Sequence, residues 1–141
     1  MVETFKRDLA VGKYHENYVL NIIKSKYNQA YIIDGYFKDY DIYVPELNFG
    51  VEVKSDKKSK YTNNIVIEIE FNSKPSALST TKAKYWVIYD GYKYKWFLTE
   101  RIKECIKENN LKYCEFTGKG DTKSKKAYLI NKELLYNYTC I

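Results

Sequence analysis

The sequence is poor in the residues that build covalent or metal frameworks. Its 141 residues include three cysteines, one histidine and two prolines. Cys105, Cys114 and Cys140 are too few and too widely spaced for a disulfide framework or a tetrahedral zinc site. The single His15 excludes a histidine-rich metal site. We therefore expect a reducing compartment, which is the cytoplasm (that of the host if the protein is viral).

Long apolar runs and leader-like segments are also lacking. No run approaches the roughly 20 apolar residues of a membrane-spanning helix, and residues 1–8 carry acidic side chains without the apolar core of a signal peptide. There is no internal repeat and no linker rich in Gly, Ser or Pro. Because 45% hydrophobic and 30% charged residues are typical of a globular chain, we expect one domain over residues 1–141 and no membrane partner.

Arginine is scarce, and this changes how the positive charge is interpreted. Two of the 24 basic residues are arginine, and part of the lysine excess can reflect A/T-rich codons. The net charge of +6 therefore indicates a nucleic-acid partner only weakly. The distribution is more informative, because residues 1–50 carry a net charge of −1 and residues 51–141 a net charge of +7.

Hydrophobic periodicity predicts helices and strands in alternation. Spacings of three and four predict helices at residues 13–27, 77–83 and 99–109, the first preceded by a helical turn at 3–10. Alternating or continuous apolar runs predict strands at residues 31–33, 40–44, 49–54, 65–71, 85–89, 93–98, 112–116 and 127–130. This order predicts an α/β (α+β) domain in which helices flank a mixed central sheet.

The most informative stretch is residues 39–54, where two alternating strands are joined by a short loop. If the hairpin is symmetric about that loop, facing residues have numbers that sum to 93. Asp41 then lies opposite Glu52, and Asp39 lies opposite Lys54, with facing Cβ atoms roughly 5 Å apart. Glu52 and Lys54 share one side of the sheet, while the intervening valines pack into the core. Asp41, Glu52 and Lys54 are therefore expected to converge.

Such a cluster has the chemistry of a hard-cation site. Carboxylate oxygens, together with the Val53 carbonyl, suit Mg²⁺ or Mn²⁺, which keep several waters. A metal bound in this way can activate water and neutralise a phosphate, and an adjacent lysine can orient the water or stabilise the transition state. The alternative is a solvent-facing strand, but two facing carboxylates argue against it because like charges repel.

The pattern resembles the PD-(D/E)XK nuclease superfamily, in which an Asp and a Glu-x-Lys on neighbouring strands bind Mg²⁺ and cleave phosphodiester bonds. The resemblance implies metal ligation by Asp41 and Glu52 and a catalytic role for Lys54; Tyr40 stands where the family motif has proline. Many members, including archaeal-type Holliday junction resolvases, carry a further Glu on the first helix. Glu16 occupies that place and is a candidate catalytic or metal-binding residue, with a plain helix-surface residue as the alternative.

Residues 74–89 are similar to the second core helix and last core strand of small phage-type nucleases. The resemblance spans about residues 12–90 and implies a restriction-endonuclease-like αβββαβ core, with residues 91–141 as an extension. It implies a Mg²⁺-dependent DNA endonuclease (Mn²⁺ substituting), selective for branched or distorted DNA such as Holliday junctions or non-specific, and acting as a homodimer. The alternatives are a non-catalytic module that binds nucleic acid or protein, and an RNA substrate.

Basic and hydroxyl side chains near this cluster are candidates for backbone contacts with nucleic acid, because phosphates would lie beside the catalytic strand. The candidates are Lys57, Lys58, Lys60, Thr81, Lys82, Lys123, Lys125 and Lys126. The alternatives are solvated loops for the lysines and a capping role for Thr81.

Four neighbouring polar residues have less specific interpretations. Asp39 faces Lys54 in this register and is an ion-pair partner, or a metal ligand if the register slips by two. Glu68 and Glu70 are interpreted as exposed strand residues, although one of them could face the site. His15 points about 100° away from Glu16 on the helix, so we expect a surface histidine.

Overall fold

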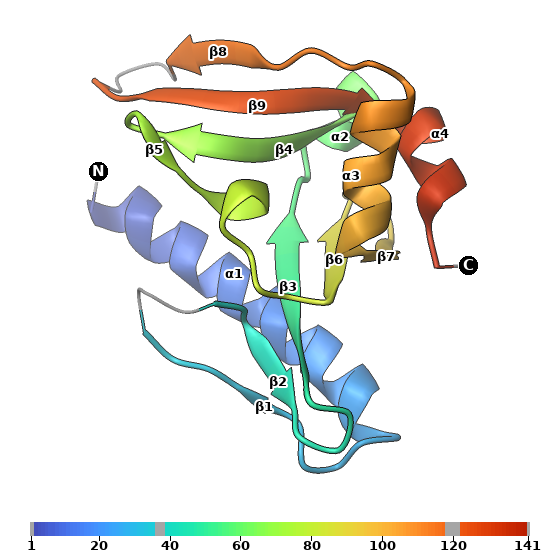
Figure 1. The fold of residues 1–141 in the computed structure, drawn as a ribbon. Helices are drawn as coiled ribbons and strands as arrows, with labels where there is room; N and C mark the ends of the chain where they lie inside the picture. Colours follow the sequence, from blue (N-terminus) through green and yellow to red (C-terminus); the bar gives the residue numbers. More distant parts are fainter. Residues whose placement is uncertain (1, 36–38, 118–121, 141) are drawn as a thin grey trace.

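A five-stranded mixed sheet forms the centre of the protein (Figure 1). The computed structural model describes residues 2–35, 39–117 and 122–140, with the backbone alone for residues 2–6 and 8. The strands of this sheet are β1 (Tyr31–Ile32), β2 (Ile42–Val44), β3 (Phe49–Ser55), β6 (Tyr85–Tyr89) and β7 (Tyr94–Leu98). They lie in that order across the sheet, β3 and β6 run parallel, and the other neighbours run antiparallel. The predicted mixed α+β class is confirmed.

A second, antiparallel sheet lies across one end of the first (Figure 1). Its order is β5 (Lys74–Pro75), β4 (Asn64–Phe71), β9 (Ser124–Asn131) and β8 (Cys114–Thr117). The prediction of one central sheet is therefore wrong for β4, which pairs with β9 rather than with the central strands. The cause is non-local pairing: Ile65 and Ile67 find their partners about 60 residues later in the chain.

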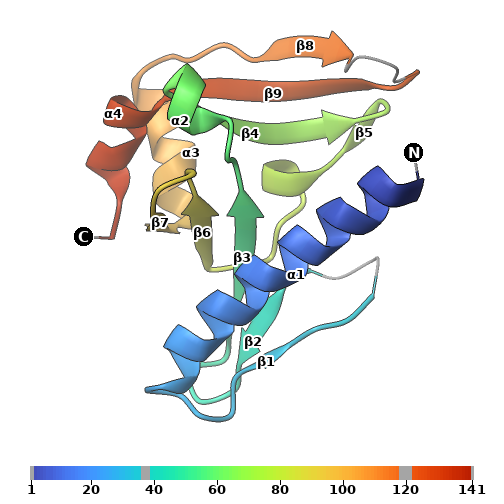
Figure 2. The same ribbon diagram turned by 180° about the vertical axis from the view of Figure 1, so that it is seen from behind.

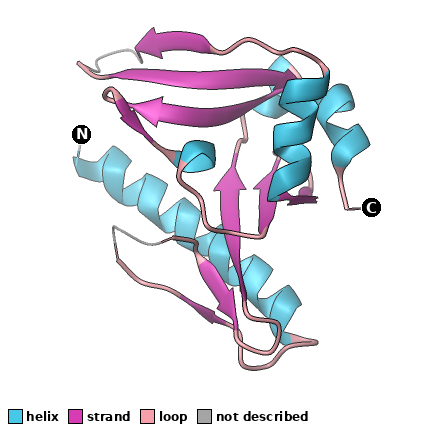
Figure 3. Cartoon of the chain, viewed as in Figure 1, coloured by secondary structure: helices cyan, strands magenta, loops and turns pink. Residues whose placement is uncertain are grey.

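Helices cover both faces of the central sheet (Figure 3). They are α1 (Val2–Lys24), α2 (Ser59–Thr62), α3 (Thr99–Glu108) and α4 (Lys132–Leu135), with 3₁₀ turns η1 (Ala77–Ser79) and η2 (Tyr136–Tyr138). Figure 2 shows α1 crossing one face of the sheet. Among the described residues, none of these helices is long and apolar enough to span a bilayer.

The two faces of the central sheet bury separate apolar cores. On one face, α1 packs Val19 and Ile23 against Val51 and Val87. On the other face, residues of the second sheet and α3 pack against Trp86, Ile88 and Phe97; those residues are Ile65, Ile67, Ile130, Ile102 and Cys105. Because side chains alternate along a strand, Val51 and Val53 point toward α1 while Glu52 and Lys54 point toward the second sheet.

Two helix predictions need correction. The first helix begins at Val2 rather than at residue 13, and Gly12 lies inside it. The second predicted helix, at residues 77–83, is reduced to η1. There the Thr81 hydroxyl oxygen accepts a hydrogen bond from the Ala83 N–H (3.1 Å), and such local bonds compete with helix formation.

Candidate functional site

The register of β2 against β3 is the one that the sequence predicts. Ile42 lies opposite Val51 and Val44 lies opposite Phe49, so facing residue numbers sum to 93. The Asp41 N–H donates to the Val51 carbonyl (3.0 Å), and Asp41 Oδ2 accepts from the Val53 N–H (2.7 Å). The Asp41 residue is 6% exposed. Its carboxylate is therefore held just before β2 begins, beside Val53 of β3.

Glu52 and Lys54 project from the opposite side of β3 to α1. In the parallel pairing, Glu52 lies beside Trp86 and Lys54 beside Ile88. The Lys54 ammonium lies 5.7 Å from the Trp86 ring centroid, so a buried aromatic ring supports it. Lys54 also lines a cavity of about 320 Å³ between the two sheets, together with Glu68. The structure thus places Glu52 and Lys54 on one face and Asp41 at the start of the neighbouring strand.

Gly50 leaves room for the side chain of Tyr40, the residue before Asp41. A Cβ atom at Gly50 would overlap the Tyr40 ring, so glycine is what allows this ring to lie on β3. The ring also stacks on Tyr43, with 5.8 Å between centroids. Burial, followed by the neighbouring Tyr43 and Asp39, raises the pKa of Tyr40. Sequence reasoning missed this contact, although a glycine opposite a conspicuous aromatic stretch was a usable signal.

The oxygen donors around Asp41 fit a hard cation. In an antiparallel pair one residue exchanges both its N–H and C=O with the same neighbour, so both groups point the same way. The Val53 carbonyl therefore faces the side on which its N–H binds Asp41. Two carboxylates and a carbonyl are suitable donors for Mg²⁺, which usually takes one or two carboxylates and keeps its waters.

Glu16, the further acid that the resemblance implies, lies on α1. The described part of the chain holds no group of three or more His, Cys, Asp or Glu side chains that could hold a metal ion. Glu16 is half-buried on α1, and α1 packs on the sheet face opposite to Glu52. The role that the resemblance implies for Glu16 remains a prediction.

Glu68 lines the same cavity as Lys54. The sequence left open whether Glu68 or Glu70 faces the site. Glu68 Oε2 accepts a hydrogen bond from the Ser76 hydroxyl (2.7 Å), and Glu68 Oε1 lies 3.9 Å from Lys125 Nζ. Glu70 forms the equivalent pair with Lys126 (3.0 Å), which raises the pKa of Lys126. Both glutamates are therefore half-buried and paired rather than simply exposed. Their lysine partners were predicted to contact nucleic acid, and each shares its charge with a carboxylate.

The other predicted nucleic-acid contacts are dispersed. Thr81 Oγ1 accepts from the Trp86 indole N–H (3.3 Å), and the Lys82 N–H donates to the Asp39 carbonyl, so this turn borders the site. Lys57 lies on the α1 side of the molecule, where it lines a cavity with Arg7. The remaining three are exposed, Lys58 and Lys60 at α2 and Lys123 near Phe71.

His15 is buried, so the prediction of a surface histidine is wrong. It is 4% exposed, stacks on Tyr89 with 4.5 Å between centroids, and its Nδ1 lies 2.5 Å from Tyr94 Oη. Burial, with a smaller contribution from Lys57, lowers the pKa of His15. Burial likewise raises the pKa of Tyr94 to about 12. This pair therefore holds α1 on the sheet as two neutral groups.

Asp90 is a second buried polar anchor, at the turn between β6 and β7. Its carboxylate accepts hydrogen bonds from Tyr136 Oη (2.5 Å) and from the backbone N–H groups of Tyr92 and Lys93, and it lies 3.7 Å from Lys132 Nζ. Burial alone would raise the pKa of Asp90, but these hydrogen bonds and the Lys132 charge outweigh it and lower the pKa. Asp90 is thus held charged.

The comparisons with known proteins leave function to be inferred from this geometry. No family model matches the chain, and no curated protein or solved structure is significantly similar to it. The candidate for chemistry is the set Asp41, Glu52 and Lys54, which lies where β3 passes the start of β2. Its oxygen donors and its lysine are suited to reactions of phosphate esters.

Proposed function

We propose that this protein is a Mg²⁺-dependent phosphodiesterase that cleaves DNA. The observation that carries the proposal is the β2–β3 register: extended by one residue beyond Ile42 and Val51, it pairs Asp41 with Glu52, and Lys54 lies two residues further along the same strand face. Two facing acids cost stability unless a cation lies between them. A purely structural hairpin has no need of that arrangement.

Each residue has a distinct task in this proposal. Asp41 and Glu52 hold the metal together with the Val53 carbonyl, and the Val53 N–H fixes the orientation of the Asp41 carboxylate. Bound Mg²⁺ supplies an activated water and neutralises phosphate charge, and Mn²⁺ can take its place. Lys54, supported by the Trp86 ring, orients the water or donates a hydrogen bond to the phosphate.

The substrate in this proposal is DNA recognised by its shape. The described elements pack around the one central sheet, and no separate unit of the described chain stands apart from it to read base sequence. Recognition then falls to backbone contacts at branched or distorted DNA, including four-way junctions. Because one site cuts one strand, a homodimer would cut two.

Cleavage assays with matched variants test the proposal. Purified protein is incubated with four-way junction, duplex and single-stranded DNA in Mg²⁺, in Mn²⁺ or in EDTA. We expect cleavage in either metal and none in EDTA. Lys54→Ala and Asp41→Ala should each reduce the rate by at least about 100-fold, because each removes transition-state stabilisation.

Two substitutions of exposed residues serve as controls. Glu133→Ala and Lys107→Ala each remove one charge of the matching sign at exposed positions of α4 and α3 and should cleave at the wild-type rate. Calorimetric titration with Mn²⁺ gives an independent readout, because Asp41→Ala should lose binding even where no DNA is present. Cleavage that persists in EDTA, or that is unchanged in both site variants, would contradict the proposal.

A further inference from the structure

Three adjoining cavities run along α1 on the sheet face opposite to Lys54. The first, of about 410 Å³, extends from Arg7 to Tyr89; the second, of about 440 Å³, lies between Tyr18 and Tyr92. These two cavities share Tyr14, His15 and Tyr89. The third, of about 280 Å³, shares Ile22 and Trp96 with the second. Because neighbouring cavities share lining residues along α1, we treat them as one row and name it the α1 groove.

Aromatic rings dominate the walls of the α1 groove. Tyr14, Tyr18 and Tyr92 are 65%, 45% and 69% exposed, so much of each ring is accessible to a ligand. Their supports are rigid, because Tyr18 stacks on Tyr94 at 4.4 Å with an interplanar angle of 11°. Buried His15 stacks on Tyr89 beneath them. Such pre-positioned rings are suited to stacking against other flat aromatic groups.

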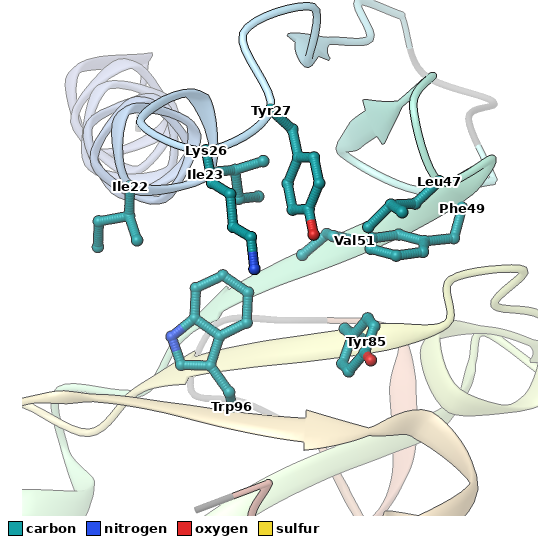
Figure 4. Close-up of a pocket in the computed structure, with 9 residues that line it drawn as sticks. All are labelled: Ile22, Ile23, Lys26, Tyr27, Leu47, Phe49, Val51, Tyr85 and Trp96. Atoms are coloured by element: carbon teal, nitrogen blue, oxygen red, sulfur yellow. The ribbon is translucent and has the colours of Figure 1, made fainter.

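The third cavity ends the groove in an apolar recess (Figure 4). Tyr27 and Phe49 form one side and Tyr85 and Trp96 the other. The Lys26 side chain extends over this recess toward Trp96 (Figure 4). A flat apolar group with an anionic neighbour would fit both features.

The charge of the groove is of one sign. Its basic lining residues are Arg7, Lys26, Lys57 and Lys93, and none of the described residues that line the three cavities is acidic. Around the exposed Tyr92 ring, the ammonium groups of Lys60 and Lys132 lie 6.0 Å and 5.4 Å from the centroid. The groove therefore offers cations between aromatic faces, complementary to a chain that carries flat rings on an anionic backbone.

We propose that the α1 groove binds single-stranded DNA, with bases stacked on the exposed tyrosines and phosphates beside the basic residues. From Arg7 to Ile22 the helix rises about 22 Å, which corresponds to about six nucleotides at the roughly 3.4 Å spacing of stacked bases. A duplex would not satisfy the groove, because its bases are paired and stacked internally. Binding is independent of the cleavage site, which lies on the other face of the sheet.

Fluorescence anisotropy with a labelled oligo(dT) 12-mer in EDTA at about 50 mM salt tests this inference. The wild-type protein should bind the strand more tightly than a 12-bp duplex. The double variant Tyr14→Ala/Tyr92→Ala should bind about 100-fold more weakly, because each stacking ring contributes about tenfold. Lys57→Gln/Lys93→Gln should flatten the salt dependence, since each phosphate contact on a single strand contributes about 0.7 to the log–log slope.

The matched control is Tyr31→Ala/Tyr113→Ala, which removes two rings that are each 50% exposed but lie outside the groove. It should bind like the wild type, and circular dichroism checks that both double variants are folded. Absence of binding, equal loss in the control, or tighter binding of the duplex or of oligo(U) would overturn the inference.

The same assay separates this inference from the proposed cleavage. Asp41→Ala and Lys54→Ala should bind the strand with wild-type affinity, because neither residue lines the groove. If these variants bind the strand normally and cleavage proves unaffected by them, the groove stands and the proposed nuclease fails. If these variants lose cleavage while the wild-type protein does not bind the strand, the proposed nuclease stands and the groove proposal fails.

Discussion

The two faces of the central sheet differ in chemistry although the same strands build both. One face of β3 presents Glu52 and Lys54 beneath the second sheet and α3. The other presents Val51 and Val53 to α1, whose edge lines an aromatic and basic groove. The difference shows how the period-two alternation of one strand can separate a candidate catalytic cluster from a candidate binding surface.

On each face of the central sheet, a buried polar residue holds the packed elements in place. The two residues differ in charge state. Asp90 ties the turn after β6 to Tyr136 and Lys132 beside the core under the second sheet and α3, and it is held charged. His15 ties α1 to Tyr94 and Tyr89 on the other face, and it is held neutral. The two faces should therefore respond differently to substitution and to pH.

The largest effect is expected from removing the Asp90 anchor. Asp90→Ala leaves Tyr136 Oη and two backbone N–H groups without their acceptor and the nearly buried Lys132 without its counter-charge. Breaking a buried pair in this way costs about 3–5 kcal/mol. Urea unfolding at pH 7 measures the free energy of unfolding, and Asp34→Ala, at an exposed position, should change it by less than about 0.5 kcal/mol. A loss below about 1 kcal/mol would show that Asp90 does not anchor this face.

A smaller effect is expected at the strand that divides the faces. Gly50→Ala places a Cβ atom in the Tyr40 ring, so the ring must move, and overpacking of this kind costs about 1–3 kcal/mol. Tyr40→Ala removes the clash, so the double variant should be less destabilised than the two single losses added together. The four free energies of unfolding form a double-mutant cycle. Additive losses would show that the ring has another place to go.

How much of each face the sequence could predict follows from how local its contacts are. The β2–β3 hairpin joins residues about ten apart, and alternation plus a short loop set its register, so the positions of Asp41 and Glu52 could be predicted. The apolar run of β6 and the hairpin to β7 were local for the same reason. These elements determine the face of β3 that carries Glu52 and Lys54.

The other features depend on contacts that no local pattern encodes. His15 is buried because Tyr94, 79 residues away, lies over it. The α1 groove needs the same long-range packing, so its tyrosines could not be separated from the other tyrosines of the chain. Glu68 pairs with Lys125 only because β4 pairs with β9 rather than with a strand of the central sheet. Such pairings are set by the competition of whole strands for partners.

The smallest effect is expected from titration, and the pH range in which stability is lost distinguishes the two anchors. The pKa of His15 in the folded protein is lowered below its ordinary value of 6.5, so below that pH the unfolded chain binds more protons than the folded one. Stability should therefore be full above pH 6.5 and decline as the pH falls below it. The lowered pKa of Asp90 acts later, since its contribution is present above 3.8 and is lost as the pH falls through the folded-state pKa.

Urea unfolding between pH 8 and pH 5 separates the anchors, because only the first falls in that window. The wild-type protein should lose stability on acidification, and His15→Gln should lose less over the same range because it has no proton to take up. Asp90→Asn is the matched control, which lowers stability at every pH in this window but keeps the wild-type slope. If His15→Gln retains the full slope, another group controls the pH response, and the neutral state of His15 is not what holds α1 on its face of the sheet.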